Sequence, residues 1–164
     1  MHYCNTAFAG SPRYITDKLQ CVLNAAPHLV TGTRKFDHGL SHSLHEELHW
    51  LDVPERIHYK LGVTVHRCLQ NKAPEYLVDS CTPVSDIPIR RNLQSATRHH
   101  LTVPRYRLSI FSHRTFSVRG PTAWNSLPYS LRDAALSSNS FRQSLRRIYF
   151  VDTTQHTQRS RDAS

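Results

Sequence analysis

The sequence predicts a mainly α-helical chain, with a small helical bundle over about residues 12–79 followed by a linker, a short β-hairpin and a C-terminal helix. Apolar residues recur at helical spacing in two long segments of the first half. Residues that favour helix starts stand in front of both segments. Hydrophobic residues make up 38% of the chain, below the usual share of about 45–50%. We therefore expect a small, loosely packed core.

The first helix is expected to begin at Ser11-Pro12, because Ser is a favourable N-cap and Pro is tolerated in the first turn. Thr31-Gly32 should end it. Pro27 lacks an N–H and clashes with the preceding turn, so it predicts a kink or an early end. One apolar stripe follows from the spacing of Ile15, Leu19, Val22, Leu23, Ala26, Leu29 and Val30.

Two capping-box spacings predict the next helices. Ser43 and Glu46 begin a short helix, and Asp52 and Glu55 begin a longer one that ends near Asn71. Pro74 should start one more short turn through residues 76–78. The apolar face of the longer helix is formed by Ile57, Leu61, Val65, Cys68 and Leu69.

The second half changes character. Residues 82–98 contain two prolines and no clear period, which is typical of a linker. Residues 101–103 and 116–118 lean towards β structure and are expected to pair as a hairpin, with Gly120-Pro121 as a turn. Trp124 should pack with Leu127 and Leu131 as a structural anchor.

A last helix is predicted from about Ser140, with Phe141, Leu145, Ile148 and Tyr149 on one side. The polar residues 151–164 are expected to be disordered. The predicted organisation is thus a helical segment (1–81), a linker (82–98), a basic hairpin-plus-helix segment (99–150) and a tail (151–164).

Charge is distributed unevenly along the chain. Residues 1–86 carry eight Lys and Arg against nine Asp and Glu, whereas residues 87–164 carry thirteen against three. All thirteen are Arg, and no carboxylate occurs from Ile87 to Arg132. Guanidinium is a planar donor suited to phosphate, so RNA or DNA is the expected partner.

Aromatic residues are interleaved with these arginines, which suits contact with backbone phosphates together with base stacking. The alternative is an ordinary cationic surface whose aromatic side chains face a core. The candidate nucleic-acid-binding residues are Arg98, Arg105, Arg107, Arg114, Arg119 and Tyr106.

Several strings in the sequence resemble the segment that follows the polymerase domain in LINE-type (non-LTR retrotransposon) reverse transcriptases. Early ones are Tyr3-Cys4-Asn5, Val22-Leu23-Asn24-Ala25-Ala26 and Leu48-His49-Trp50-Leu51-Asp52-Val53-Pro54. Later ones are Ala73-Pro74-Glu75-Tyr76-Leu77 and Leu101-Thr102-Val103-Pro104-Arg105. The most specific block is Phe116-Ser117-Val118-Arg119-Gly120-Pro121, continuing through Trp124-Asn125-Ser126-Leu127-Pro128. The resemblance spans roughly residues 3–150 in the order found in such elements.

The resemblance implies a non-catalytic chain. Polymerisation in that family depends on palm aspartates that hold two metal ions, and this sequence contains no Asp-Asp pair. Both the polymerase and the endonuclease would lie upstream of Met1. We expect no catalytic residue and no cofactor here. The alternative is a decayed copy without a selected function. Pro27 within a predicted helix and the lack of the polymerase domain also favour this alternative.

A third reading comes from His45-Glu46-Glu47-Leu48-His49, which matches the H-E-x-x-H pattern of zinc hydrolases. The segment before Pro54 is short for such a helix, and the resemblance above already accounts for these residues. We therefore expect no metal site.

The cellular compartment of the protein is indicated by two features of the sequence. The four cysteines are widely spaced, and there is neither a signal peptide nor a long apolar run. These features predict reduced thiols in an intracellular protein with no membrane partner. Nucleus and cytoplasm are not distinguished, and the oligomeric state is left open.

Overall fold

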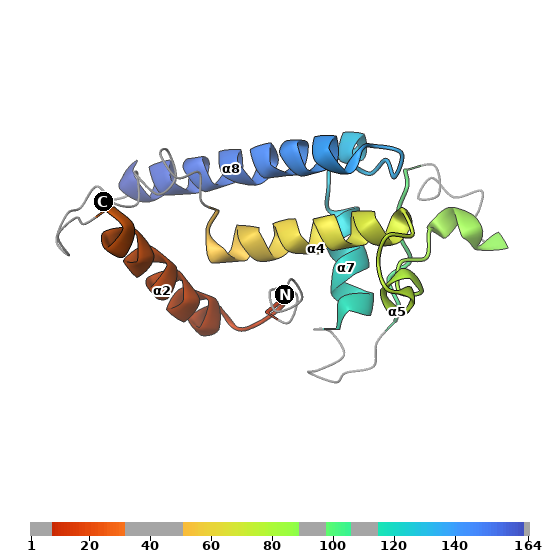
Figure 1. Ribbon diagram of the computed structural model, residues 1–164, viewed down its shortest axis with the longest axis horizontal. Helices are drawn as coiled ribbons and strands as arrows, with labels where there is room; N and C mark the ends of the chain where they lie inside the picture. Colours follow the sequence, from red (N-terminus) through yellow and green to blue (C-terminus); the bar gives the residue numbers. More distant parts are fainter. Residues whose placement is uncertain (1–7, 32–50, 89–97, 106–114, 163–164) are drawn as a thin grey trace. The chain divides into compact units, whose positions relative to one another are not determined.

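A computed structural model of the chain describes residues 8–31, 51–88, 98–105 and 115–162, and within these ranges it is mainly helical (Figure 1). No strand occurs among these residues. The helices are α2 (Arg13–Thr31), α4 (Val53–Leu69), α5 (Glu75–Val78), α7 (Phe116–Asn125) and α8 (Ser138–Asp162), with 3₁₀ turns at Val84–Asp86 and Tyr129–Leu131.

Two compact units divide the chain. Unit 1 consists of Met1–Gly10 and Ile57–Leu145, and unit 2 of Ser11–Arg56 and Arg146–Ser164. Unit 1 draws on both the predicted helical segment and the predicted basic segment. The predicted bundle of residues 12–79 is therefore not confirmed, since Ile57 to Val78 fold together with α7 and the start of α8.

Helix α4 follows the predicted pattern. Its buried face includes Ile57, Leu61, Val65 and Cys68, which confirms the period expected for it. The helix ends in a Schellman motif, with Lys72 N–H donating to Arg67 O at 2.9 Å and Asn71 N–H to Cys68 O at 3.0 Å. Asn71 adopts φ +54°, the left-handed conformation that this motif needs.

The predicted hairpin is wrong. Residues 116–118 form the first turn of α7, and Thr115 precedes them with extended backbone at φ −65° and ψ 149°. Val118, Pro121 and Trp124 are three residues apart and all buried, so the helical period decides the structure of this segment. Residues 116–118 favour β structure locally, but three residues are too few to show a period. Burial of one face of the helix overrides this local β preference.

Gly120-Pro121 was likewise expected as a turn but lies inside α7. A Cβ on Gly120 would lie 3.0 Å from the Phe116 ring and 3.2 Å from Val65 Cγ2. The glycine thus lets α7 approach α4 closely, and both Gly120 and Pro121 are buried there. This tertiary contact offsets the cost of a proline within the helix, about 3 kcal/mol.

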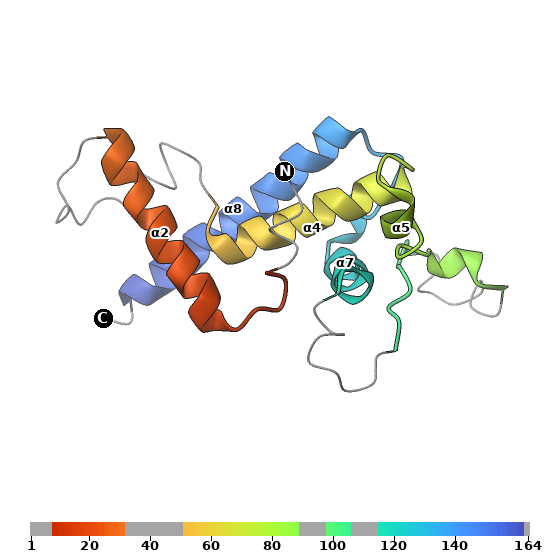
Figure 2. The same ribbon diagram turned by 60° about the horizontal axis from the view of Figure 1, so that its bottom comes forward.

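The core of unit 1 is centred on Trp124, Phe141, Leu145 and Val65, each completely buried. Within this unit the end of α4 and the start of α8 run in opposite directions, and α7 lies across α4 (Figures 1 and 2). Leu127 and Leu131 are also buried. The prediction that Trp124 is a structural anchor is confirmed.

Helix α8 begins near the predicted residue and continues to Asp162. The backbone is therefore helical over most of the tail that was predicted to be disordered. Residues 151–162 contain neither Gly nor Pro. Since each added residue brings one hydrogen bond once a helix has started, nothing in this stretch stops the helix.

In unit 2, α2 confirms the first predicted helix and ends at Thr31, where its end was expected. Of the two effects expected at Pro27, a kink or an early end, the early end does not occur. Val22, assigned to the apolar stripe, is 70% exposed. Adjacent positions of a helix point about 100° apart, so Val22 lies off the half-buried side of α2 that Ile15, Leu19, Leu23 and Ala26 share. The helix predicted from Ser43 lies outside the described residues.

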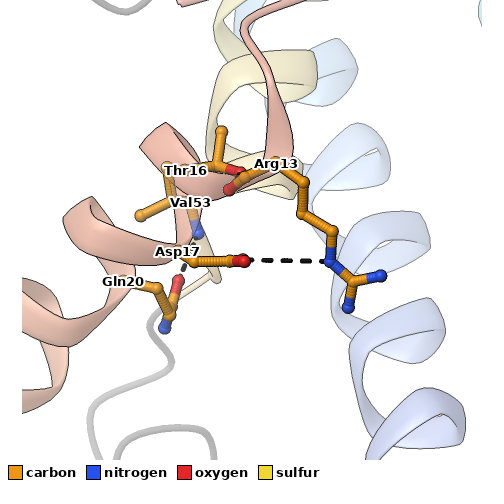
Figure 3. Close-up of polar contacts among 5 residues, drawn as sticks. All are labelled: Arg13, Thr16, Asp17, Gln20 and Val53. Carbon is orange, nitrogen blue, oxygen red and sulfur yellow. Dashed lines mark hydrogen bonds and ion pairs between the residues drawn. The ribbon is translucent and has the colours of Figure 1, made fainter.

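Gln20 joins α2 to the start of α4 within unit 2. Its Oε1 accepts the N–H of Val53 at 2.8 Å (Figure 3). Its Nε2 donates to Asp52 Oδ1, also at 2.8 Å. The first N–H groups of a helix have no partner within it. Gln20 supplies one of these partners from a distant part of the chain. Nearby, Arg13 and Asp17 form an exposed ion pair at 3.9 Å on α2 (Figure 3).

Candidate nucleic-acid interface

The structure describes three of the six predicted site residues. Arg98 and Arg105 are exposed, and Arg119 is half-buried on α7. Tyr106, Arg107 and Arg114 lie outside the described residues.

Arg119 has a structural contact of its own. A Cβ built on Gly10 would lie only 2.5 Å from Arg119 Nη2, so the guanidinium covers the backbone of Gly10. Gly10 has φ +75°, a conformation that favours glycine. Arg119 thus helps to hold residues 8–10 in unit 1, which sequence reasoning did not foresee.

Residues 98–102 are fixed by side chains at the end of α7. The indole Nε1–H of Trp124 donates to His99 O at 3.0 Å. Asn125 accepts the Leu101 N–H at 2.8 Å and donates to Leu101 O at 2.9 Å. His99 has φ +53°, a left-handed conformation that costs a non-glycine residue about 1 kcal/mol. These bonds hold the segment in that conformation.

The same segment is held from its other side by residues 82–84. Val84 N–H donates to His100 O and Thr102 N–H to Thr82 O, each at 2.9 Å. Pro83 and Leu101 form an isolated antiparallel bridge. The backbone that carries Arg98, His99 and His100 is therefore fixed at several points.

Arg132 is a site residue that sequence reasoning missed. It follows the 3₁₀ turn Tyr129–Leu131, with its N–H donating to Tyr129 O at 3.1 Å, and it is only 8% exposed. Its Nε and Nη1 are buried and have no hydrogen-bond partner in the part of the chain that the structure describes. Burial lowers the pKa of Arg132, and the charge of Arg98 lowers it further, while Tyr129 acts in the opposite direction.

His100 lies in the same positive field. Its pKa is lowered first by burial and then by the charges of Arg132 and Arg98. The ring of His99 lies 5.9 Å from the ring of Tyr129, one turn before Arg132. We call Arg98, His100 and Arg132 the cationic cluster. The one signal in the sequence for Arg132 was its place as the last residue of the stretch without carboxylates, Ile87 to Arg132.

Asp133 is the nearest carboxylate in sequence, but its charge is not among those that shift the pKa of Arg132 or His100. Its Oδ1 accepts the Ala135 N–H at 2.8 Å, and its charge raises the pKa of His66. The cluster therefore brings together two arginines and a histidine. The buried Nε and Nη1 of Arg132 lack hydrogen-bond partners among the described residues, which favours binding of an anion.

Other chemistry-bearing groups of unit 1 lie in its core. His66 is 1% exposed and stacks on Phe141, with ring centroids 4.2 Å apart. Cys68 and Cys81 are buried free thiols joined by a side-chain hydrogen bond, which lowers the pKa of Cys68 and raises that of Cys81. Their burial suits packing, and neither lies in an exposed position where a substrate would reach it.

Metal binding finds no support in the described part of the chain, where no three His, Cys, Asp or Glu side chains converge on one point. His45, Glu46 and His49 lie outside it. Among the described helices, none has the length and apolar character that crossing a membrane requires. Comparisons with protein-family models, curated proteins and solved structures found no match to this chain.

Proposed function

We propose that this chain is a non-catalytic, nucleic-acid-binding segment of the kind that follows the polymerase domain in LINE-type reverse transcriptases. In this proposal the chain contacts the RNA or DNA backbone without sequence preference. The supporting observation is the charge pattern: Ile87 to Arg132 holds eight Arg and no carboxylate. Phosphate neutralisation by such a stretch supplies nonspecific affinity.

The fixed backbone around Arg98 adds to this support. Arg98 is exposed and stands on a segment that Trp124, Asn125 and Val84 hold by hydrogen bonds. A cationic residue on ordered backbone loses less conformational entropy on binding than one on a free loop. Arg105 is exposed just beyond that segment.

Catalysis is not part of the proposal. The sequence has no Asp-Asp pair that would serve as the metal-holding palm motif of the family it resembles. Any polymerisation would belong to a separate core, and this chain would supply contact with the nucleic acid.

Two double variants with equal net charge test the proposal. Arg98→Gln/Arg105→Gln removes two exposed arginines of the basic half, whereas Arg13→Gln/Arg56→Gln removes two exposed arginines of the other half. Fluorescence anisotropy with a single-stranded RNA oligonucleotide should show at least about a tenfold loss of affinity for the first pair at low salt, because each phosphate contact contributes separately. The second pair should change it by less than about threefold.

Equal losses in both pairs would show that only net charge matters, and the proposal would then be wrong. A further variant replaces Arg105, Arg107 and Arg114 together. Its affinity should fall at least as far as that of the first pair.

A further inference from the structure

The charge balance around Arg132 is incomplete within unit 1. Its side chain is 8% exposed, and its Nε and Nη1 have no hydrogen-bond partner among the described residues. A buried charged group without partners is strongly unfavourable, and proteins normally pair it or supply hydrogen bonds. The neighbouring Arg98 makes this worse, because its positive charge lowers the pKa of Arg132 further.

The location of Arg132 is also well defined. The turn Tyr129–Leu131 places it, Leu131 is buried, and the His99 ring lies against Tyr129. His99 itself is held in a left-handed conformation by the Trp124 indole. The three basic side chains thus come from two chain segments that the core of unit 1 fixes.

We propose that the cationic cluster of Arg98, His100 and Arg132 is a binding site for a single phosphate group. Phosphate presents several acceptor oxygens and a full negative charge, and guanidinium is well matched to it. The bound group would supply a counter-charge, since Asp133 is not among the charges that shift the pKa of Arg132 or His100.

The phosphate could come from two sources that share this chemistry: a nucleic-acid backbone or free inorganic phosphate. Assignment to a backbone rests on the proposed function above, whereas the anion site itself does not. In either case the site would combine an exposed guanidinium, Arg98, with a buried one, Arg132.

Thermal unfolding in sodium phosphate and in sodium chloride at equal ionic strength tests the site. We expect phosphate at about 20 mM to raise the melting temperature of the chain by about 3 °C over chloride, as binding to the folded state requires. Arg98→Gln should remove at least half of this difference. Arg142→Gln, an exposed arginine of α8 in the same unit, should leave it unchanged.

Arg132→Met gives the sharper result. It should abolish the phosphate effect and raise the melting temperature in chloride, because it removes a buried charge whose Nε and Nη1 have no partners among the described residues. If Arg132→Met does not fold, the melting temperatures of Arg98→Gln and His100→Gln in phosphate and chloride decide the question. Equal melting temperatures of the unmodified chain in phosphate and chloride would overturn the proposal, as would an undiminished phosphate effect in Arg98→Gln and His100→Gln.

RNA titrations of the same variants separate the sources. Weaker RNA binding by His100→Gln and Arg132→Met, with competition by inorganic phosphate beyond the effect of ionic strength, would support a backbone phosphate. Unchanged RNA affinity with a preserved phosphate effect on the unmodified chain would support a free-phosphate site. If RNA does not bind at all, the proposed function fails, while the melting experiment still decides the anion site.

Discussion

His66 places an ionisable ring in the core of unit 1, stacked on Phe141 at 4.2 Å and with its centroid 6.3 Å from that of Trp124. Its pKa is lowered from 6.5, chiefly by burial and further by the charges of Lys72 and Arg142, although a hydrogen bond to Leu136 O and the charge of Asp133 oppose this. The ring is therefore neutral in the folded chain at pH 7. The unfolded chain binds a proton more readily, so acid favours unfolding.

We expect the free energy of unfolding to fall as the pH drops below 6.5 towards the lower pKa of folded His66. Above 6.5 this contribution is constant. His66→Gln should flatten the dependence, because the amide does not titrate in this range and still offers a donor to Leu136 O. Urea unfolding at several pH values measures the effect. An unchanged slope in the variant would assign the pH dependence to other groups, including His58 and His100, whose pKa values burial also lowers.

Gln70 ties the end of α4 to the segment before α8. Its Nε2 donates to Leu136 O at 2.9 Å and to Ala134 O at 3.2 Å, and its Oε1 accepts from Ser138 Oγ at 3.0 Å. Gln70→Ala should destabilise the chain by about 1–3 kcal/mol, since these groups lose their partner in a half-buried position.

The matched control is Gln143→Ala, which removes the same side chain from an exposed position on α8. It should change stability by less than about 0.5 kcal/mol. Denaturant midpoints compare the two. Similar losses would mean that the Gln70 contacts are dispensable.

Helix ends show how far the elements follow from sequence. Asn71 was identified as the end of α4, and it takes the left-handed position of a Schellman motif at φ +54°. Asn71→Ala should cost about 1 kcal/mol, whereas Asn71→Gly should be neutral or slightly stabilising, because glycine adopts this conformation without steric penalty. Thermal unfolding of the two variants tests this, and a greater loss for glycine would contradict it.

Long periodic segments could be predicted, and short or tertiary features could not. Helices α2, α4 and α8 each have enough turns for an apolar face to be visible in the sequence. Helix α7 has only ten residues and contains a Gly-Pro pair, so its local sequence favours a turn. Its helical state depends on close contact of Gly120 with Val65, which no local pattern reveals.

The candidate site illustrates the same limit. Arg98 and Arg105 were identified from charge alone, and both are exposed. Burial of Arg132 depends on the turn at Tyr129–Leu131 and on segment 98–102, which join residues about thirty positions apart. The cap that Gln20 provides for Val53 is another long-range contact without a local signal.

At the level of the whole chain, unit 1 combines a largely helical core with the arginine-rich stretch, and the core fixes the backbone that carries Arg98. The proposal therefore requires the folded chain, not only its charge. Heat-unfolded or denatured chain should bind RNA less tightly than folded chain at the same ionic strength.

A salt series of RNA-binding titrations tests this account most directly. Anisotropy with a single-stranded RNA oligonucleotide, on a sample whose helical circular dichroism is verified, gives the affinity at each salt concentration. The account predicts a loss of about tenfold or more between about 50 and 200 mM salt, which corresponds to roughly three neutralised phosphates at ~0.7 per contact. An affinity independent of salt, or no binding by the folded chain, would contradict it and favour a decayed fragment that keeps only the resemblance.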